Sequence, residues 1–112
     1  MISRSYKTEE PKENPHKVDV KQLYSKESAQ IMHITLQSGE TLKPHKTPVD
    51  VTFYVLEGTP TVHVGEESKV FEKDTLIESP ANIVHHLSNE GDMQARILVT
   101  KAPRPTTQTK LL

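Results

Sequence analysis

The stretch "GETLKPHKTPVDVTFYVLEG", residues 39–58, carries the strongest fold signal in the chain. It begins and ends on a glycine, places His45 six residues after the first glycine, and contains the apolar run "VTFYVL". Runs of β-branched and aromatic residues between turn-forming residues are typical of strands. The stretch therefore predicts a strand between two turns with a histidine ahead of it, and it raises the question of whether that histidine binds a metal.

Similar short apolar runs recur along the rest of the chain. They are rich in β-branched residues and are bounded by Gly, Pro, Asn or Asp, whose backbone preferences suit chain reversals. This pattern favours an all-β sandwich or barrel. Between residues 18 and 30, the apolar Val20, Leu23 and Tyr24 are also compatible with one short helical turn. The predicted strand segments are "AQIMHITL", "VTFYVL", "TVHV", "KVF", "TLIE", "IVHHL" and "ARILVT".

Length and composition indicate one domain with polar ends. A chain of 112 residues is long enough for a single core. Residues 1–17 mix Lys and Glu with two prolines and are too polar to bury anything alone, so they predict a polar N-terminal arm. Pro103 and Pro105 oppose both helix and central strand, so residues 103–112 are expected to form an extended tail. The barrel domain then spans residues 18–102.

Charge and hydropathy narrow the classes of partner. The formal net charge is -1 and 26% of the residues are charged, so the composition does not indicate the basic surface that binds nucleic acid. No run approaches the roughly 18 apolar residues that cross a bilayer, and the polar start lacks the apolar stretch of a signal peptide, so a cytoplasmic protein is expected. With no cysteine in the chain, any metal would need His, Asp or Glu ligands. The expected partners are a small molecule and a second copy of the chain.

The opening stretch resembles the first motif of the cupin family, a small β-barrel of the jelly-roll or double-stranded β-helix type with a site inside its wider end. That motif runs Gly, five residues, His, one residue, His, three or four residues, Glu, six residues, Gly. Gly39, His45 and Gly58 match it. Thr47 stands at the second His position and Val51 at the Glu position.

The segment "DTLIESPANIVHHLSN", residues 74–89, resembles the second cupin motif. Pro80, His85 and Asn89 match, while Asp74 and Asn82 replace the two glycines of the motif. Asn and Asp enter the positive-φ region more readily than other non-glycine residues, so these replacements keep the turns. The chain is thus identified as resembling a single-domain cupin over roughly residues 28–101.

The resemblance also implies a metal site of which only half is present. In the family, the two His and the Glu of the first motif and the His of the second motif ligate one divalent metal. Here His45 and His85 remain, whereas Thr47 is a poor substitute for imidazole and Val51 has no donor atom.

Asp50 is the candidate for a third ligand. On a regular strand it would face away from His45 and Val51, but Pro48 can accompany a bulge that re-aims the following residues. Two imidazoles and one carboxylate would suit Fe, Mn, Ni, Zn or Cu. The alternative is a metal-free pocket, and the sequence leaves both open.

These motifs place a ligand pocket at one end of the barrel. His33 is a further candidate for its lining, with a solvent-facing position as the alternative, because it alternates with apolar residues in its run. His16 lies in the polar arm and is assigned no role. The predicted pocket residues are His45, Thr47, Asp50, Val51, His85 and His33, and the predicted metal ligands are His45, His85 and Asp50.

The leading function is the binding of a small molecule in the barrel, with or without a divalent metal on His45 and His85. One alternative is a metal-dependent cupin enzyme of the oxygenase or isomerase type. Another is a metal-free binding module, or a structural or interaction subunit whose lumen is filled by side chains. The resemblance further implies a homodimer. No catalytic residue and no reaction are assigned.

Overall fold

All regular structure in the computed structural model, which describes residues 1–107 and 109–112, is β-strand, and the all-β prediction is confirmed. Most of the runs expected from the sequence coincide with strands, and three strands, at residues 19–26, 45–46 and 110–111, lie outside those runs. The strands are β1 (Asp19–Lys26), β2 (Ala29–Leu36), β3 (His45–Lys46), β4 (Asp50–Glu57), β5 (Thr61–Val64), β6 (Glu67–Val70), β7 (Leu76–Ser79), β8 (His85–Ser88), β9 (Ala95–Ala102) and β10 (Lys110–Leu111).

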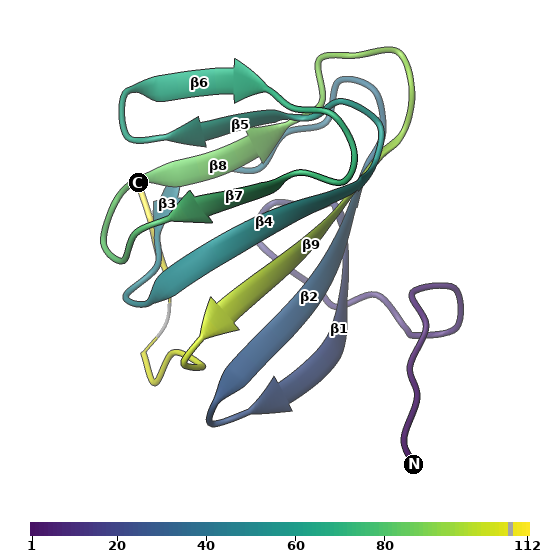
Figure 1. The fold of residues 1–112 in the computed structure, drawn as a ribbon, viewed down its shortest axis with the longest axis vertical. Coiled ribbons are helices and arrows are strands. Elements are labelled where there is room, and N and C mark those ends of the chain that lie inside the picture. The colour runs from purple at the N-terminus through teal and green to yellow at the C-terminus, as the bar shows by residue number, and fades with distance from the viewer. Residues whose placement is uncertain (108) are drawn as a thin grey trace.

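Two five-stranded antiparallel sheets form the barrel (Figure 1). The first sheet has the order β1-β2-β9-β4-β7, and the second has the order β10-β3-β8-β5-β6. Alternate residues of β4 point into the barrel, so Val51, Phe53 and Val55 are buried while their neighbours are only partly covered. Leu36 and Leu87 bring the two sheets together in the same core. Each such side chain contributes roughly 1.5–3 kcal/mol relative to an exposed position.

The segment between residues 18 and 30, which was also compatible with a helical turn, forms the strand β1. The helical alternative is therefore wrong. β1 pairs with β2 from Asp19 opposite Thr35 to Lys26 opposite Ala29. The register shifts between Gln22 and Tyr24, which marks a β-bulge. The bulge adds one residue to the strand, so the apolar spacing departs from strict alternation without any helix.

The turn positions inferred from the two motifs have the expected backbone. Gly39 and Gly58 have φ of 86° and 77°, and Asp74 and Asn82 have φ of 64° and 63°. The Asp74 amide donates to Val55 O at 2.7 Å, tying its turn to the end of β4. Asp and Asn therefore support the same left-handed turns as glycine at these positions, as predicted from the sequence.

The N-terminal arm folds back over the first sheet. The Lys12 amide donates to Val20 O at 2.7 Å, and Lys21 Nζ donates to Tyr6 O at 2.6 Å. The Tyr6 ring stacks on His33, with 4.3 Å between ring centroids. These contacts hold the arm against the outer face of β1 and β2.

The C-terminal segment adds the short edge strand β10 to the second sheet. Leu111 pairs with His45 of β3, and the Leu112 amide donates to Pro44 O at 3.1 Å. Figure 1 places this end of the chain beside β3 and β8. Position 108 of the predicted tail lies outside the described residues. The C-terminal segment is thus joined to the second sheet at its β3 edge.

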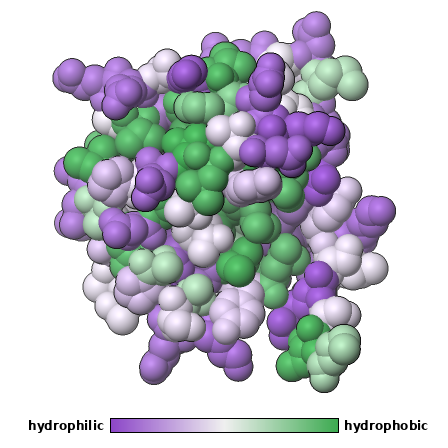
Figure 2. Space-filling model, viewed as in Figure 1, coloured by the Kyte–Doolittle hydropathy of each residue, from purple (hydrophilic) through white to green (hydrophobic). Residues whose placement is uncertain are grey.

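Apolar side chains also gather on one outer face. Figure 2 shows hydrophobic residues grouped over β5, β6 and β7. A groove of about 720 Å³ lies there, lined by Val62, Phe71 and Ile77 among others. In the part of the chain that the structure describes, no helix is long and apolar enough to span a membrane.

Candidate functional site

A cavity of about 380 Å³ lies between the sheets, beside residues 14–16 of the arm and beside β10. Its volume is in the range of small-molecule sites. Side chains from both sheets and from both chain ends line it, including Asn14 from the arm and Leu111 from β10. The apolar part of its wall is formed by Val20, Met32, Ile34, Val51, Phe53 and Val99.

The two motif histidines meet in this cavity. β3 and β8 pair at a single position, His45 opposite His85, so the residues are cross-strand neighbours. Their ring centroids lie 4.6 Å apart with the planes at 81°, and the Phe53 ring lies edge-on to His85 at 5.2 Å. Residues 40 positions apart in sequence are thus brought together by pairing across the second sheet.

Both ring nitrogens of His85 have partners inside the protein. Its Nδ1 lies 2.6 Å from Ser79 Oγ, and its Nε2 lies 3.3 Å from Thr47 Oγ1. All three side chains are buried. Thr47 therefore occupies a ligand position of the cupin motif as a hydrogen-bond partner of the neighbouring imidazole, and each nitrogen of His85 already lies within hydrogen-bonding distance of a hydroxyl group.

His45 presents an acceptor to the cavity. Its Nδ1 donates to Lys43 O at 2.7 Å, which requires the proton on that nitrogen because a carbonyl oxygen only accepts. In the neutral ring, Nε2 then carries the lone pair. Burial lowers the pKa of His45, and the charge of Lys101 lowers it further against the opposing effect of the Lys43 hydrogen bond.

His16 joins this group, although the sequence analysis assigned it no role. Its ring centroid lies 5.0 Å from that of His45, and its Nδ1 accepts a hydrogen bond from the Lys43 amide at 2.8 Å. The neutral ring therefore carries its proton on Nε2. The single peptide segment at Lys43 thus fixes opposite tautomers in the two histidines, an acceptor in His45 and a donor in His16.

The position of His16 depends on a turn that the sequence did signal. The Asn14 side chain donates to Val18 O at 2.9 Å and accepts from the His16 amide at 3.1 Å. Asn-Pro pairs such as Asn14 and Pro15 favour turn initiation. That pair was the available sign of an ordered segment within the polar arm.

Lys101 is the second cavity residue that the sequence analysis missed. It follows Val99 on the inward face of β9, is half-buried, and lines the cavity. Burial lowers its pKa from the ordinary lysine value. No Asp or Glu belongs to the cavity wall among the described residues.

Burial and the nearby lysine keep the imidazoles neutral. Burial lowers the pKa of His16 and of His85 to about 4 each, with further lowering from His45 and from Lys101. At pH 7 the cavity therefore combines one amine with uncharged imidazoles. Its polar end suits a ligand that accepts hydrogen bonds.

The remaining predicted pocket residues divide into two groups. Val51 lines the cavity and Thr47 is buried beside His85. Asp50 is exposed, and its Oδ1 accepts a hydrogen bond from the Ala81 amide at 2.9 Å. Pro48 does not re-aim it, and the structure does not bring Asp50 to the two imidazoles.

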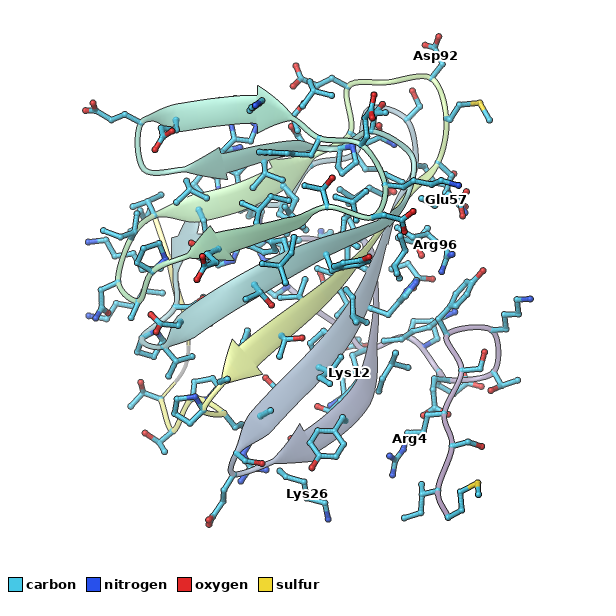
Figure 3. The ribbon with its side chains drawn as sticks, in the orientation of Figure 1. Arg4, Lys12, Lys26, Glu57, Asp92 and Arg96 are labelled. Atoms are coloured by element: carbon cyan, nitrogen blue, oxygen red, sulfur yellow. The ribbon has the colours of Figure 1, made fainter. Side chains whose placement is uncertain are left out.

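His33 lies on the opposite face of β2 from the cavity, so it neither lines the pocket nor faces solvent. It is buried beneath Tyr6, and Arg96 Nη1 donates to its Nε2 at 3.0 Å. Arg96 also pairs with Glu57 at 2.7 Å, and the two side chains lie next to each other in Figure 3. Strand alternation explains the result, because Met32 and Ile34 on either side point into the cavity.

The residues present do not fit the divalent metal of the fold family. Among residues 1–107 and 109–112, no group of three or more His, Asp or Glu side chains could hold a metal ion. His85 has both nitrogens engaged, and Asp50 is directed to the Ala81 amide. A protein site for such an ion usually needs three or more ligands.

A family model for the cupin domain matches residues 32–101 of the chain. The chain belongs to the cupin family. The resemblance seen in the two motifs, and the cupin-type barrel it implied, are therefore confirmed.

Two relatives of this cupin are similar in sequence. It is 32% identical over 77 residues to the tetracenomycin polyketide synthase protein TcmJ of Streptomyces glaucescens, which covers 65% of this chain and 52% of that protein. The chain thus spans about half the length of this curated relative. The crystal structure of TT1209 from Thermus thermophilus is 30% identical, with a TM-score of 0.80 over 94% of this chain and 100% of that one.

A third similarity concerns the fold alone. The polyketide cyclase RemF from Streptomyces resistomycificus has a TM-score of 0.83, with 13% identity over 100% of this chain and 86% of that one. At this level of identity, the likeness extends to the arrangement of the strands and not to the site.

Proposed function

We propose that this cupin binds a small, largely apolar molecule through an oxygen-bearing group, without a resident metal. The observation that carries the proposal is Lys101 at the end of an apolar cavity, where it has no ion-pair partner in the described part of the chain. Burying an amine without a partner is unfavourable, so such a group is usually kept for a ligand.

The two tautomers held by Lys43 support the same proposal. His16 offers an N–H and His45 offers a lone pair, so a ligand oxygen and a ligand hydroxyl can both be bound beside Lys101. The apolar wall would enclose the carbon skeleton. The name of TcmJ contains the words polyketide synthase protein, and as part of the proposal we extend a ligand of the polyketide class to this chain.

The alternatives have less support. A metal-dependent oxygenase or isomerase would need a third ligand, and Asp50 is bound elsewhere. A purely structural barrel would fill its lumen, whereas a cavity of about 380 Å³ lies here.

Binding is tested by titrating the protein with benzoate, acetophenone or benzyl alcohol. The amide chemical shifts are measured during each titration, with and without EDTA. We expect saturable shifts confined to the cavity residues and unchanged by the chelator. Met32→Trp should weaken binding at least about tenfold, or roughly 1.4 kcal/mol, because the larger side chain occupies the cavity. Met93→Trp is the matched control, since Met93 is 75% exposed and does not line the cavity.

Two results would overturn the proposal. One is binding that is equally strong in Met32→Trp. The other is near-stoichiometric metal in the protein purified without a histidine tag, together with loss of binding when that metal is removed.

We also propose that the chain forms a homodimer, using the apolar face over β5, β6 and β7. Val70, Leu76 and Ile83 are 58%, 53% and 41% exposed there, and exposed apolar groups next to edge strands are typical of pairing surfaces. Light scattering should give twice the chain mass of 12.6 kDa, and a single-chain mass in Leu76→Lys. A parent protein of single-chain mass would refute the dimer. The cytoplasmic location expected from the sequence stays a prediction.

A further inference from the structure

Lys101 is held in a defined place by strand pairing on both sides. In the first sheet it lies opposite Gln30 of β2 and opposite Val51 of β4. Its backbone therefore cannot move independently of three strands. The side chain extends from this rigid base into the cavity, next to Val99 and the histidines.

The surroundings of Lys101 favour the uncharged amine. The cavity wall is mainly apolar and, among the described residues, contributes no carboxylate that would stabilise an ammonium ion. Burial accordingly lowers the pKa of Lys101. An unprotonated lysine in an apolar pocket is the form that attacks carbonyl carbon.

The neighbouring imidazoles offer the proton transfers that such an attack needs. His45 Nε2 is an acceptor and His16 Nε2 is a donor, as fixed by their bonds to Lys43. His16, His45 and Lys101 all line the same cavity, so one bound ligand can contact all three groups. A neutral imidazole can take up a proton at its bare nitrogen and can donate a hydrogen bond through its N–H.

We propose that Lys101 forms an imine with an aldehyde or ketone bound in the cavity, an inference that rests on the proposed small-molecule binding and names its ligand class. The amine nitrogen bonds to the carbonyl carbon as the carbon–oxygen double bond becomes a single bond, and the N–H of His16 donates a hydrogen bond to the oxygen. His45 Nε2 takes one proton from the nitrogen and passes it to that oxygen, giving a neutral carbinolamine. The remaining N–H proton of the carbinolamine is passed by the same ring to the hydroxyl group, which leaves as one molecule of water when the carbon–oxygen bond breaks and a carbon–nitrogen double bond forms.

The test uses benzaldehyde with sodium cyanoborohydride near pH 7 and peptide mass spectrometry. The reductant transfers hydride to the imine carbon and converts it into a stable secondary amine. We expect the benzyl adduct at Lys101 to form several-fold faster than at any other lysine, and benzyl alcohol to slow only that adduct by competition. Lys101→Arg should remove the fast labelling and keep a cation, and Met32→Trp should suppress it by filling the cavity.

The outcomes separate this inference from the proposed function. If benzyl alcohol binds in the cavity but Lys101 is labelled no faster than Lys46 or Lys69, the imine proposal is overturned and small-molecule binding stands. If neither compound binds, both proposals fail. Fast labelling of Lys101 that benzyl alcohol does not slow would also overturn the inference, because the reaction would then not use the cavity.

Discussion

The Gly58→Ala variant is expected to lose roughly 2–5 kcal/mol of folding free energy, from about 1–2 kcal/mol for the left-handed backbone and about 1–3 kcal/mol for overpacking. Gly58 has φ of 77°, and a Cβ built there would lie 2.5 Å from Gln94 O and 2.8 Å from the Ala95 Cα. Both are backbone atoms, so no flexible side chain can move aside. Urea unfolding followed by circular dichroism measures the loss.

Gly39→Ala is the matched control. Gly39 has φ of 86° but no heavy atom within 4 Å of an added Cβ, so it carries the backbone strain without the steric contact. We expect a loss of about 1–2 kcal/mol there. Equal losses in the two variants would contradict the argument, because the close approach of β4 to the chain before β9 would then contribute nothing.

The Asn89→Asp variant is expected to lose roughly 3–5 kcal/mol at pH 7, the range for a buried charge without compensation. Asn89 is 1% exposed, and its Nδ2 donates to Leu36 O at 3.0 Å and to Met93 O at 2.8 Å. Aspartate is almost isosteric but places a negative oxygen against two carbonyl oxygens. Urea unfolding at pH 7 measures the loss against the parent chain.

The pH dependence of this difference gives an internal check. Protonation of the new carboxyl group removes its charge, so the loss relative to the parent should shrink as the pH is lowered towards about 4. Asn82→Asp is the control, because Asn82 is exposed and Asp tolerates its φ of 63°. An Asn89→Asp variant as stable as Asn82→Asp would show that the buried amide donors are dispensable.

These two predictions assign structural roles to residues of the cupin motifs. Gly58 permits a close approach of two chain segments, and Asn89 ties the end of β8 to β2 and to the following loop. Neither residue lines the cavity. Matching these motif positions is therefore a reliable sign of the fold and says little about the chemistry of the site.

The site itself shows what replaces a lost metal ligand. Thr47 hydrogen-bonds to His85, Val51 contributes to the apolar wall, and Lys101 places an amine in the cavity. The sequence showed the two missing ligands, but it did not show Lys101 or His16. Both lie far along the chain from the motifs, so no local pattern relates them to His45.

The sequence by itself determined most of the strands, the turns of the two motifs and the family. Strand periodicity and turn chemistry depend on residues close together in the chain, which is why Asp74 and Asn82 were correctly predicted as positive-φ turns. Only the tertiary structure decided which side chains share the cavity. Strand pairing brought His45 to His85, the folded arm added His16, alternation removed His33, and the Ala81 amide engaged Asp50. These outcomes depend on contacts between distant segments, which a linear pattern does not specify.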